Sequence, residues 1–352
     1  MSVRELISIP STPIAATIGR AFLNGSPRLS SRIAFLSRNK LRLSQHFSRS
    51  GYGGARAYVS PAIWYSKQIG HAGNSCIGMT RDKTYSESIM TTVGEIGQFI
   101  NEFAPVELAE EWDNVGLLVG DSNGEVENVM TCLTITPESA AEAIAKKADV
   151  IVAHHPLPFR AMKRLTTANT ASRLLLDLIK ADVAIISPHT GFDSAAKGIN
   201  SQLAEKFQLT DVCPLVASES LGQEVGAART GSPSKEATLQ LLIDQAKSAF
   251  GLTQIRFVGS RNQPVTKVAL CCGSGGTFLD KAIAADCDAL ITGETTFHTC
   301  LEAKANGVAL ILLGHHNSER FAVESLAKVI GEEFSGLNVW ASEDETDPVR
   351  VG

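Results

Sequence analysis

Histidine and carboxylate side chains follow three of the short apolar runs in this chain. The runs and the residues after them are 149–153 with His154 and His155, 183–188 with His189 and Asp193, and 308–314 with His315 and Glu319. An open α/β sheet binds its ligands at the carboxyl ends of its strands. Because imidazole and carboxylate groups are ligands for zinc, iron and manganese, the pattern predicts a metal site where these strands end.

The spacing within two of these segments indicates how their side chains share a metal. His315 and Glu319 stand four residues apart at a predicted helix start, so they lie on one face of that helix and could hold one ion. His154 and His155 diverge at a strand end and could serve two metals, or one metal and a substrate. His316 points elsewhere and is the weaker candidate.

Other polar residues near the strand ends have more than one interpretation. Asp193 fits a metal ligand and a helix N-cap equally well. His189 is a candidate for orienting Asp193 from outside the ligand shell. Glu294 and His298 repeat the four-residue spacing after the run 288–292. We interpret both as lining the pocket, where they either hold a ligand in place or act as acid and base.

A glycine-rich segment, Gly273-Ser274-Gly275-Gly276, follows the predicted strand 265–272 and opens a predicted helix. Its backbone N–H groups could hold an anion at the helix start. A tight strand-to-helix turn explains the same residues equally well. The segment lacks the full GxGxxG pattern, so a dinucleotide-binding reductase has little support.

Strands and helices are predicted to alternate after residue 90. The strands are expected within 110–120 and at 126–135, 149–153, 182–187, 254–258, 265–272, 288–292, 308–313 and 337–341. The helices are expected at 91–103, 137–147, 170–181, 194–207, 235–250, 277–286, 297–306 and 316–331. This alternation predicts an α/β fold of two similar lobes with mainly parallel central sheets. We place the first lobe at 89–216, a connector at 217–234 and the second lobe at 235–352.

The first 88 residues have the composition of an organelle transit peptide, with a disordered basic segment as the alternative. Residues 1–90 hold 12 Lys and Arg but only 3 Asp and Glu, and serine is abundant. Such a basic, acid-poor segment is drawn to anionic import surfaces. Arg56-Ala57-Tyr58 resembles a mitochondrial cleavage site. We therefore expect a mitochondrial protein, with the plastid as the alternative destination.

The remainder of the chain is acidic, which bears on its partners. The whole sequence has 32 Lys and Arg and 37 Asp and Glu, so residues 91–352 hold 20 and 34. Nucleic-acid binding needs clustered positive charge, so we expect no nucleic-acid partner. The sequence has no apolar run near the roughly 18 residues of a spanning helix, so we expect no membrane partner.

Taken together, six ordered motifs resemble the NIF-three-like family, also known as GTP cyclohydrolase 1 type 2 homologs. They are Glu111-Trp112-Asp113-Asn114-Val115-Gly116, Ala153-His154-His155-Pro156, His189-Thr190-Gly191-Phe192-Asp193, Gly273-Ser274-Gly275-Gly276, Thr292-Gly293-Glu294 and Gly314-His315-His316-Asn317-Ser318-Glu319-Arg320. The resemblance runs from about residue 92 to the C-terminus. The connector is too short for the extra domain that some members insert, so the chain resembles the compact form.

The resemblance implies a dinuclear metal centre in a cleft between two α/β lobes, within a ring-shaped hexamer. The ligands that it implies are His154, His155, Asp193, His315 and Glu319. The chain departs from the family pattern in two places. Gly191-Phe192 stands where the family has Asn-Leu, and His316 stands where it often has Tyr. Whether His316 or His189 joins the metal shell stays open at this stage.

The leading hypothesis is a hydrolase that uses two divalent ions, zinc, iron or manganese, to activate water. His155 or His298 would move protons, with Glu294 beside them. The resemblance implies GTP or another nucleotide-like heterocycle as the substrate. The alternative hypothesis is a metal-binding regulatory or interaction protein without turnover.

Overall fold

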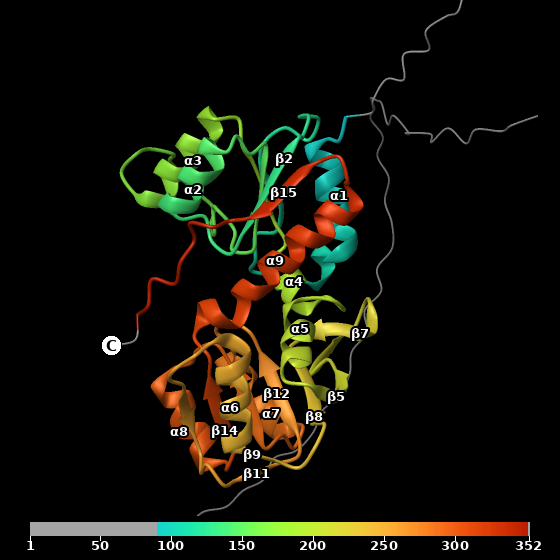
Figure 1. Cartoon of the computed structure of the whole chain (residues 1–352), viewed down its shortest axis with the longest axis vertical. Coiled ribbons are helices and arrows are strands. Elements are labelled where there is room, and N and C mark those ends of the chain that lie inside the picture. Colours follow the sequence, from blue (N-terminus) through green and yellow to red (C-terminus); the bar gives the residue numbers. More distant parts are fainter. Residues whose placement is uncertain (1–89, 351–352) are drawn as a thin grey trace, which may run out of the picture. The chain divides into compact units, whose positions relative to one another are not determined.

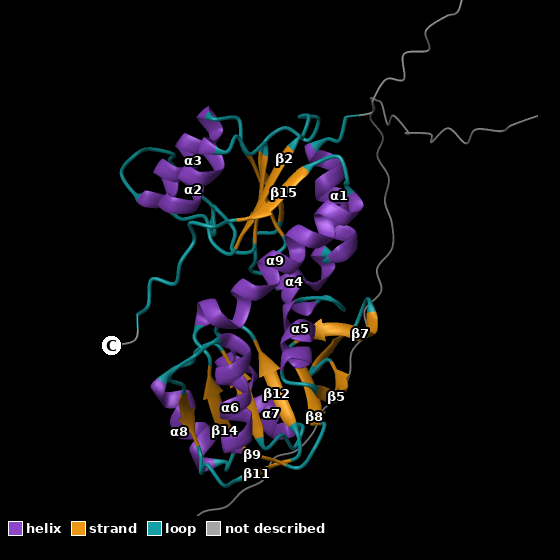
Figure 2. Cartoon of the chain, viewed as in Figure 1, coloured by secondary structure: helices purple, strands orange, loops and turns teal. Residues whose placement is uncertain are grey.

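The computed structural model describes residues 90–350, which belong to one compact unit. They form a mixed α/β fold, which confirms the predicted class (Figure 1, Figure 2). The proposed transit segment 1–88 lies outside the described residues, so its cleavage and its destination stay predictions. In the part of the chain that the structure describes, no helix is long and apolar enough to cross a bilayer.

Five strands form the first sheet, in the order β1-β4-β3-β2-β15. Their bounds are β1 Gly116–Val119, β2 Asn128–Cys132, β3 Val150–Ala153, β4 Ala184–Ser187 and β15 Asn338–Ala341. All neighbours run parallel except β1, which is antiparallel to β4. The first sheet is therefore mainly parallel, as predicted.

Helices cover both faces of this sheet, and the strand sequences explain why. Val150 and Val152 of β3 belong to the same apolar cluster as helix α1 (Val93–Phe103), whereas Ile151 belongs to the cluster of α2 (Pro137–Ala145) and α3 (Thr170–Lys180). Side chains alternate along a strand, so a strand buried on both faces needs an unbroken apolar run.

Six strands form the second sheet, in the order β10-β14-β13-β12-β8-β5. Their bounds are β5 Leu209–Cys213, β8 Arg229–Pro233, β10 Arg256–Val258, β12 Val268–Cys271, β13 Ala289–Thr292 and β14 Ala309–Leu312. Only the central strands β12, β13 and β14 are parallel, and the remaining pairings are antiparallel. The second sheet is thus mixed rather than mainly parallel.

The segment 217–234, predicted to be a connector, is built of strands instead. It contains the hairpin β6 (Val216–Ser218) and β7 (Gly222–Ala227), followed by β8. The hairpin is largely exposed and β8 carries polar residues inward, so neither shows the apolar alternation that marks a strand. The sheets also cross the predicted lobe boundaries, because β5 lies in the second sheet and β15 in the first.

The remaining elements complete the layers. They are α4 His189–Ser194, α5 Ile199–Lys206, α6 Leu239–Phe250, α7 Leu279–Ala284, α8 Phe297–Ala305, α9 His315–Glu333, the short strands β9 Ala237–Thr238 and β11 Pro264–Val265, and the 3-10 turns Val106–Leu108 and Gly275–Phe278. Helix α9 starts after β14 of the second sheet and packs on β2 and β15 of the first (Figure 1).

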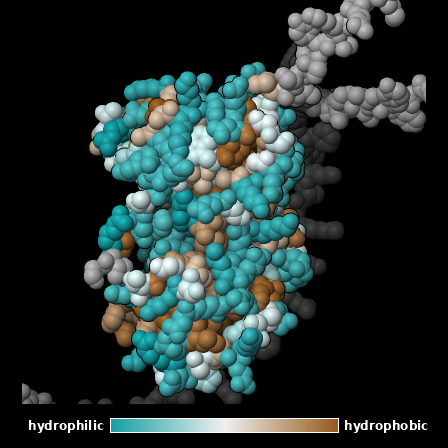
Figure 3. Space-filling model, viewed as in Figure 1, coloured by the Kyte–Doolittle hydropathy of each residue, from teal (hydrophilic) through white to brown (hydrophobic). Residues whose placement is uncertain are grey.

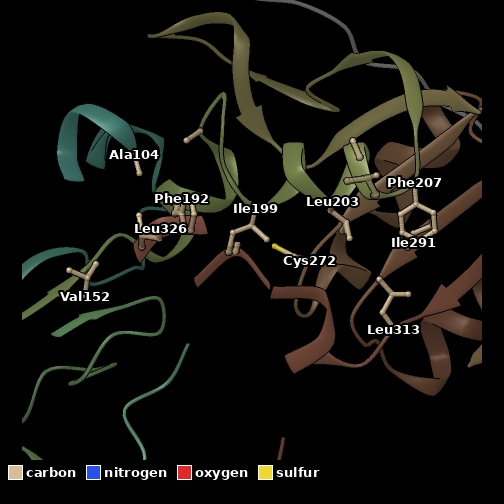
Figure 4. Close-up of a cluster of buried hydrophobic side chains, with 14 of the residues drawn as sticks. Ala104, Val152, Phe192, Ile199, Leu203, Phe207, Cys272, Ile291, Leu313 and Leu326 are labelled. Carbon is tan, nitrogen blue, oxygen red and sulfur yellow. The ribbon is translucent and has the colours of Figure 1, made fainter. Parts of the chain in front are cut away.

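One apolar cluster runs continuously between the two sheets. Phe192 and Ile199 lie in it beside Leu326 of α9, and Leu203 leads toward Ile291 of the second sheet (Figure 4). Hydrophilic side chains cover most of the face seen in Figure 3. The shared core therefore fixes the carboxyl ends of strands from both sheets relative to one another.

Candidate metal centre

The histidines that follow these strands meet in two overlapping groups. His154, His155 and His189 offer ring nitrogens within 4.8 Å of one another, and so do the ligand atoms of His155, His315 and Glu319. His155 belongs to both groups. The side chains come from the ends of β3 and β4 in the first sheet and from the segment after β14 of the second sheet. These residues could bind a metal ion.

Asp193 joins the first group through His154. The Nε2 atom of His154 lies 3.6 Å from Oδ1 of Asp193. His155, His189, Asp193, His315 and Glu319 all line one cavity of about 730 Å³. The structure thus brings together all five predicted ligands and adds His189.

Two buried groups in this cluster lack a conventional partner. His154 is 1% exposed, and neither of its ring nitrogens has a hydrogen-bond partner. The Oε2 atom of Glu319 lies 3.2 Å from Nε2 of both His155 and His315, but neither contact has hydrogen-bond geometry. Leaving such groups unsatisfied costs roughly 1–3 kcal/mol each. A divalent cation accepts the lone pairs of these N and O atoms, so the residues fit a metal.

Three of the imidazoles are oriented by a partner on their outer nitrogen. Nδ1 of His155 pairs with Thr134 Oγ1 at 2.7 Å, and Nδ1 of His315 pairs with Glu294 Oε1 at 2.9 Å. Each ring thereby directs Nε2 toward Glu319. Such outer partners fix the tautomer and orientation of a metal-binding histidine.

The third outer partner is Asp113, which the sequence analysis did not single out. Its carboxylate lies 2.7 Å from Nδ1 of His189 and also accepts hydrogen bonds from Thr190. Burial alone would raise the pKa of Asp113, but the bonds from His189 and Thr190 outweigh it and lower the pKa to about 2. His189 is therefore oriented by Asp113, and among residues 90–350 no hydrogen bond joins His189 to Asp193. The two residues are 76 positions apart, so no local spacing could reveal the pair.

Asp193 lies inside α4, and its position is fixed by contacts with Cys272, which directly follows β12, and with Asn200. Because α5 begins only at Ile199, the N-cap interpretation of Asp193 is wrong. The thiol of Cys272 donates to Asp193 Oδ1 at 3.1 Å. Asn200 accepts from the Cys272 backbone N–H and donates to the Asp193 carbonyl. Cys272 and Asn200 thus tie the end of β12 to α4.

The ionisable side chains of the cluster differ in their charge in the metal-free protein. Burial lowers the pKa of His154 and raises the pKa of Asp193. Burial would also raise the pKa of Glu319, but its pairing with His155 and His315 outweighs this and lowers the pKa. That pairing raises the pKa of His315 to about 9. Glu319 is therefore the permanent negative charge, and His154 is a neutral imidazole as a metal requires.

We expect metal-free protein to lose stability as the pH rises from 6.5 to about 9. The pKa of His315 rises from 6.5 to about 9 on folding, so its pairing stabilises the fold fully below pH 6.5 and is lost above pH 9. The pKa of Asp193, which folding raises from 3.8 to about 7, gives a loss of the same sign at lower pH, between 3.8 and about 7. The measurement is Tm against pH in the presence of a chelator. His315→Gln should reduce the slope, whereas the control His298→Gln should keep it; an equal effect of both would contradict the assignment.

The glycine-rich segment is explained by close packing rather than by an anion. The N–H groups of Gly273 and Gly275 already donate to Ser318 Oγ and Thr292 Oγ1, each at 2.9 Å. A Cβ on Gly273, whose φ is +56°, would collide with Oε1 of Glu319. The backbone at Gly273 therefore forms one wall of the space that the Glu319 carboxylate occupies.

Gly273→Ala should displace Glu319 and weaken metal binding. The left-handed φ alone costs an alanine roughly 1–2 kcal/mol. The matched control is Gly251→Ala, since Gly251 has φ +64° but nothing within 4 Å of a built Cβ. Both variants should lose stability, measured as Tm, but only Gly273→Ala should lose bound metal, measured by elemental analysis. Equal metal content in both variants would show that Gly273 does not position Glu319.

Two of the remaining predictions need correction. His298 is exposed on α8 and does not line the cavity, so the prediction that it lines the pocket is wrong. The four-residue spacing does not place Glu294 and His298 on one helix face, because α8 begins at Phe297 with Thr296 as its N-cap and Glu294 lies outside the helix. Glu294 is also absent from the cavity lining, but it accepts from Ser274 Oγ and pairs with His315, so it orients a predicted metal ligand, in line with one of its two interpretations. His316 does not line the cavity either.

Comparison with known proteins identifies the family. The family model described as Duf34/NIF3 (NGG1p interacting factor 3) matches residues 91–348. The chain belongs to the Duf34/NIF3 family. This confirms the resemblance to the NIF-three-like family.

Relatives within the Duf34/NIF3 family cover most of this chain. A Clostridium perfringens protein named GTP cyclohydrolase 1 type 2 homolog is 33% identical over 262 residues, which are 73% of this chain and 98% of the relative. The protein NIF3 homolog of Schizosaccharomyces pombe is 32% identical over 259 residues, covering 69% and 92%.

Solved structures of similar proteins support the same fold. A hypothetical protein of Staphylococcus aureus has a TM-score of 0.68 at 27% identity and covers 74% of this chain and 99% of its own. A Bacillus cereus protein related to NIF3 has a TM-score of 0.69 at 21% identity, covering 75% and 100%. The second likeness concerns the fold alone.

Proposed function

We propose that this Duf34/NIF3 protein is a hydrolase that depends on two divalent metal ions and acts on a nucleotide-like substrate. The observation that carries the proposal is the pair of histidine groups around His155, with the unpartnered nitrogens of His154 and the unpartnered Oε2 of Glu319. A bound divalent ion lowers the pKa of a water molecule toward neutrality, which supplies hydroxide for hydrolysis.

The residues around the cavity can be assigned to two metal ions. His154, His189 and Asp193 would hold one ion, and His315 with Glu319 the other, with His155 between them. Glu319 and Asp193 would offset part of the positive charge. Since Nε2 of His155 faces Glu319, we assign His155 to metal binding rather than to proton transfer.

The substrate class rests on relatives named GTP cyclohydrolase 1 type 2 homolog. The test is to strip the full chain with a chelator, reload it separately with zinc, iron or manganese, and follow consumption of GTP. We expect turnover only in reloaded protein. Absence of turnover with all three metals, at full metal occupancy, would contradict the hydrolase proposal and favour a metal-binding regulatory or interaction protein.

Hexameric assembly remains a proposal from the family resemblance. Its check is the mass of the purified protein in solution, measured by light scattering. A monomeric mass at working concentration would contradict it.

A further inference from the structure

Two large aromatic side chains stand exposed beside the histidine cluster. Trp112 is 61% exposed and Phe159 is 45% exposed, and their ring centroids are 5.9 Å apart. Trp112 precedes β1, and Phe159 follows β3. Each ring also lies against His189, with centroid distances of 6.0 and 6.1 Å. Exposed apolar surface concentrated beside a polar site indicates a binding surface.

The two rings form a wall shared by two hollows. Trp112 and Phe159 line the cavity of the histidine cluster and also a second hollow of about 670 Å³. Asp113, Asn114 and Arg160 line the second hollow as well. A planar ligand on these rings therefore extends toward the histidines at one edge and toward Arg160 at the other.

Charge is distributed differently on the two sides of this wall. The cavity side carries the carboxylates of Glu110, Asp193 and Glu319. Three exposed cations follow Phe159 in the chain, Arg160, Lys163 and Arg164, and Arg160 lines the second hollow. Among residues 90–350, none of these three cations is in an ion pair. The Asp113 carboxylate in the second hollow is already taken by His189 and Thr190.

We propose that Trp112 and Phe159 bind the heteroaromatic ring of the substrate, while Arg160, Lys163 and Arg164 bind its phosphate groups. A nucleotide then enters ring first, and the chemistry at the metal centre takes place on the base rather than on a phosphate. Stacking of a base on an aromatic side chain is sequence-tolerant and strong enough to orient a ligand. The proposal rests on the proposed function for the reaction, but ligand binding can be measured without turnover.

The experiment measures binding to the full chain without metal, so that phosphates have no ion to bind. GTP, guanosine and tripolyphosphate are titrated by calorimetry. Trp112→Leu should weaken GTP and guanosine binding roughly tenfold or more and leave tripolyphosphate binding unchanged. Trp112→Phe keeps a ring and should restore most of the affinity. Phe297→Leu, at an exposed phenylalanine outside the cavity, is the control.

A second variant tests the phosphate end. Neutralising Arg160, Lys163 and Arg164 to Gln should weaken GTP and tripolyphosphate binding and flatten its salt dependence, while guanosine binding stays unchanged. The matched control neutralises three exposed cations elsewhere, Arg256, Lys281 and Lys304. Unchanged GTP affinity in both the Trp112→Leu and the neutralised variant would overturn the proposal. Loss of tripolyphosphate binding in Trp112→Leu would overturn the ring-first orientation.

Three further outcomes separate this inference from other occupants and from the proposed function. A single-stranded oligonucleotide carries the same base and phosphates, and affinity rising with its length would overturn a mononucleotide as the occupant. If GTP binds as described but is not consumed by metal-loaded protein, the proposed function fails and the binding site stands. If the parent protein and Trp112→Leu consume GTP equally at limiting GTP, the inference about Trp112 is refuted and the proposed function stands.

Discussion

Replacing Glu319 with Gln should remove bound metal and, with it, any metal-dependent turnover. Glu319 is 3% exposed, and its Oε2 lies 3.2 Å from the Nε2 atoms of both His155 and His315. An amide keeps the size of the side chain but loses the negative charge at the centre of the cluster. Removal of an outer partner alone costs roughly 10–100-fold in metal affinity, so loss of this carboxylate should cost more.

The measurement is metal content after chromatography, together with affinity from a competition titration with a chelating dye. Glu332→Gln is the matched control, because Glu332 lies on the same helix α9 with its side chain 66% exposed. Its metal content should equal that of the parent protein. A full metal complement in Glu319→Gln would refute the assignment of this carboxylate as a ligand.

Replacing Arg229 with Leu should cause a large loss of stability. Arg229 is 2% exposed and donates to four backbone carbonyls and one hydroxyl, those of Gly226, Ala228, Ser194, Ala195 and Ser201. Two of these carbonyls end α4, the helix that carries Asp193. Each buried acceptor left unsatisfied costs roughly 1–3 kcal/mol, so we expect a total loss of about 3 kcal/mol or more. For a body of this size that corresponds to roughly 6–12 °C in Tm.

Thermal unfolding with and without metal is the measurement for Arg229→Leu. The control is Arg173→Leu, which removes an exposed guanidinium from α3 and should leave Tm nearly unchanged. Arg229→Lys should lie between the two, because an ammonium has only three donors to offer. If the Tm of Arg229→Leu falls no further than that of Arg173→Leu, the network does not stabilise α4.

Most secondary structure was predictable because burial on both faces leaves a plain sequence pattern. The apolar runs at 149–153 and 308–313 predicted β3 and β14, and the periodic segment at 91–103 predicted α1. The prediction of a connector at 217–234 was wrong because the strands in this segment are either exposed or carry polar side chains inward. A buried arginine such as Arg229 in β8 interrupts the apolar pattern, and only its tertiary hydrogen bonds make its burial tolerable.

The sequence by itself determined most of the alternating strands and helices, and its motifs, through their resemblance to the family, supplied the five predicted ligands. Tertiary structure alone decided which groups complete the site. It paired His189 with Asp113 and set Gly273 against Glu319, and it left His298 exposed outside the cavity. The physical reason is that these contacts join segments dozens of residues apart, and only packing around the shared core fixes their distances.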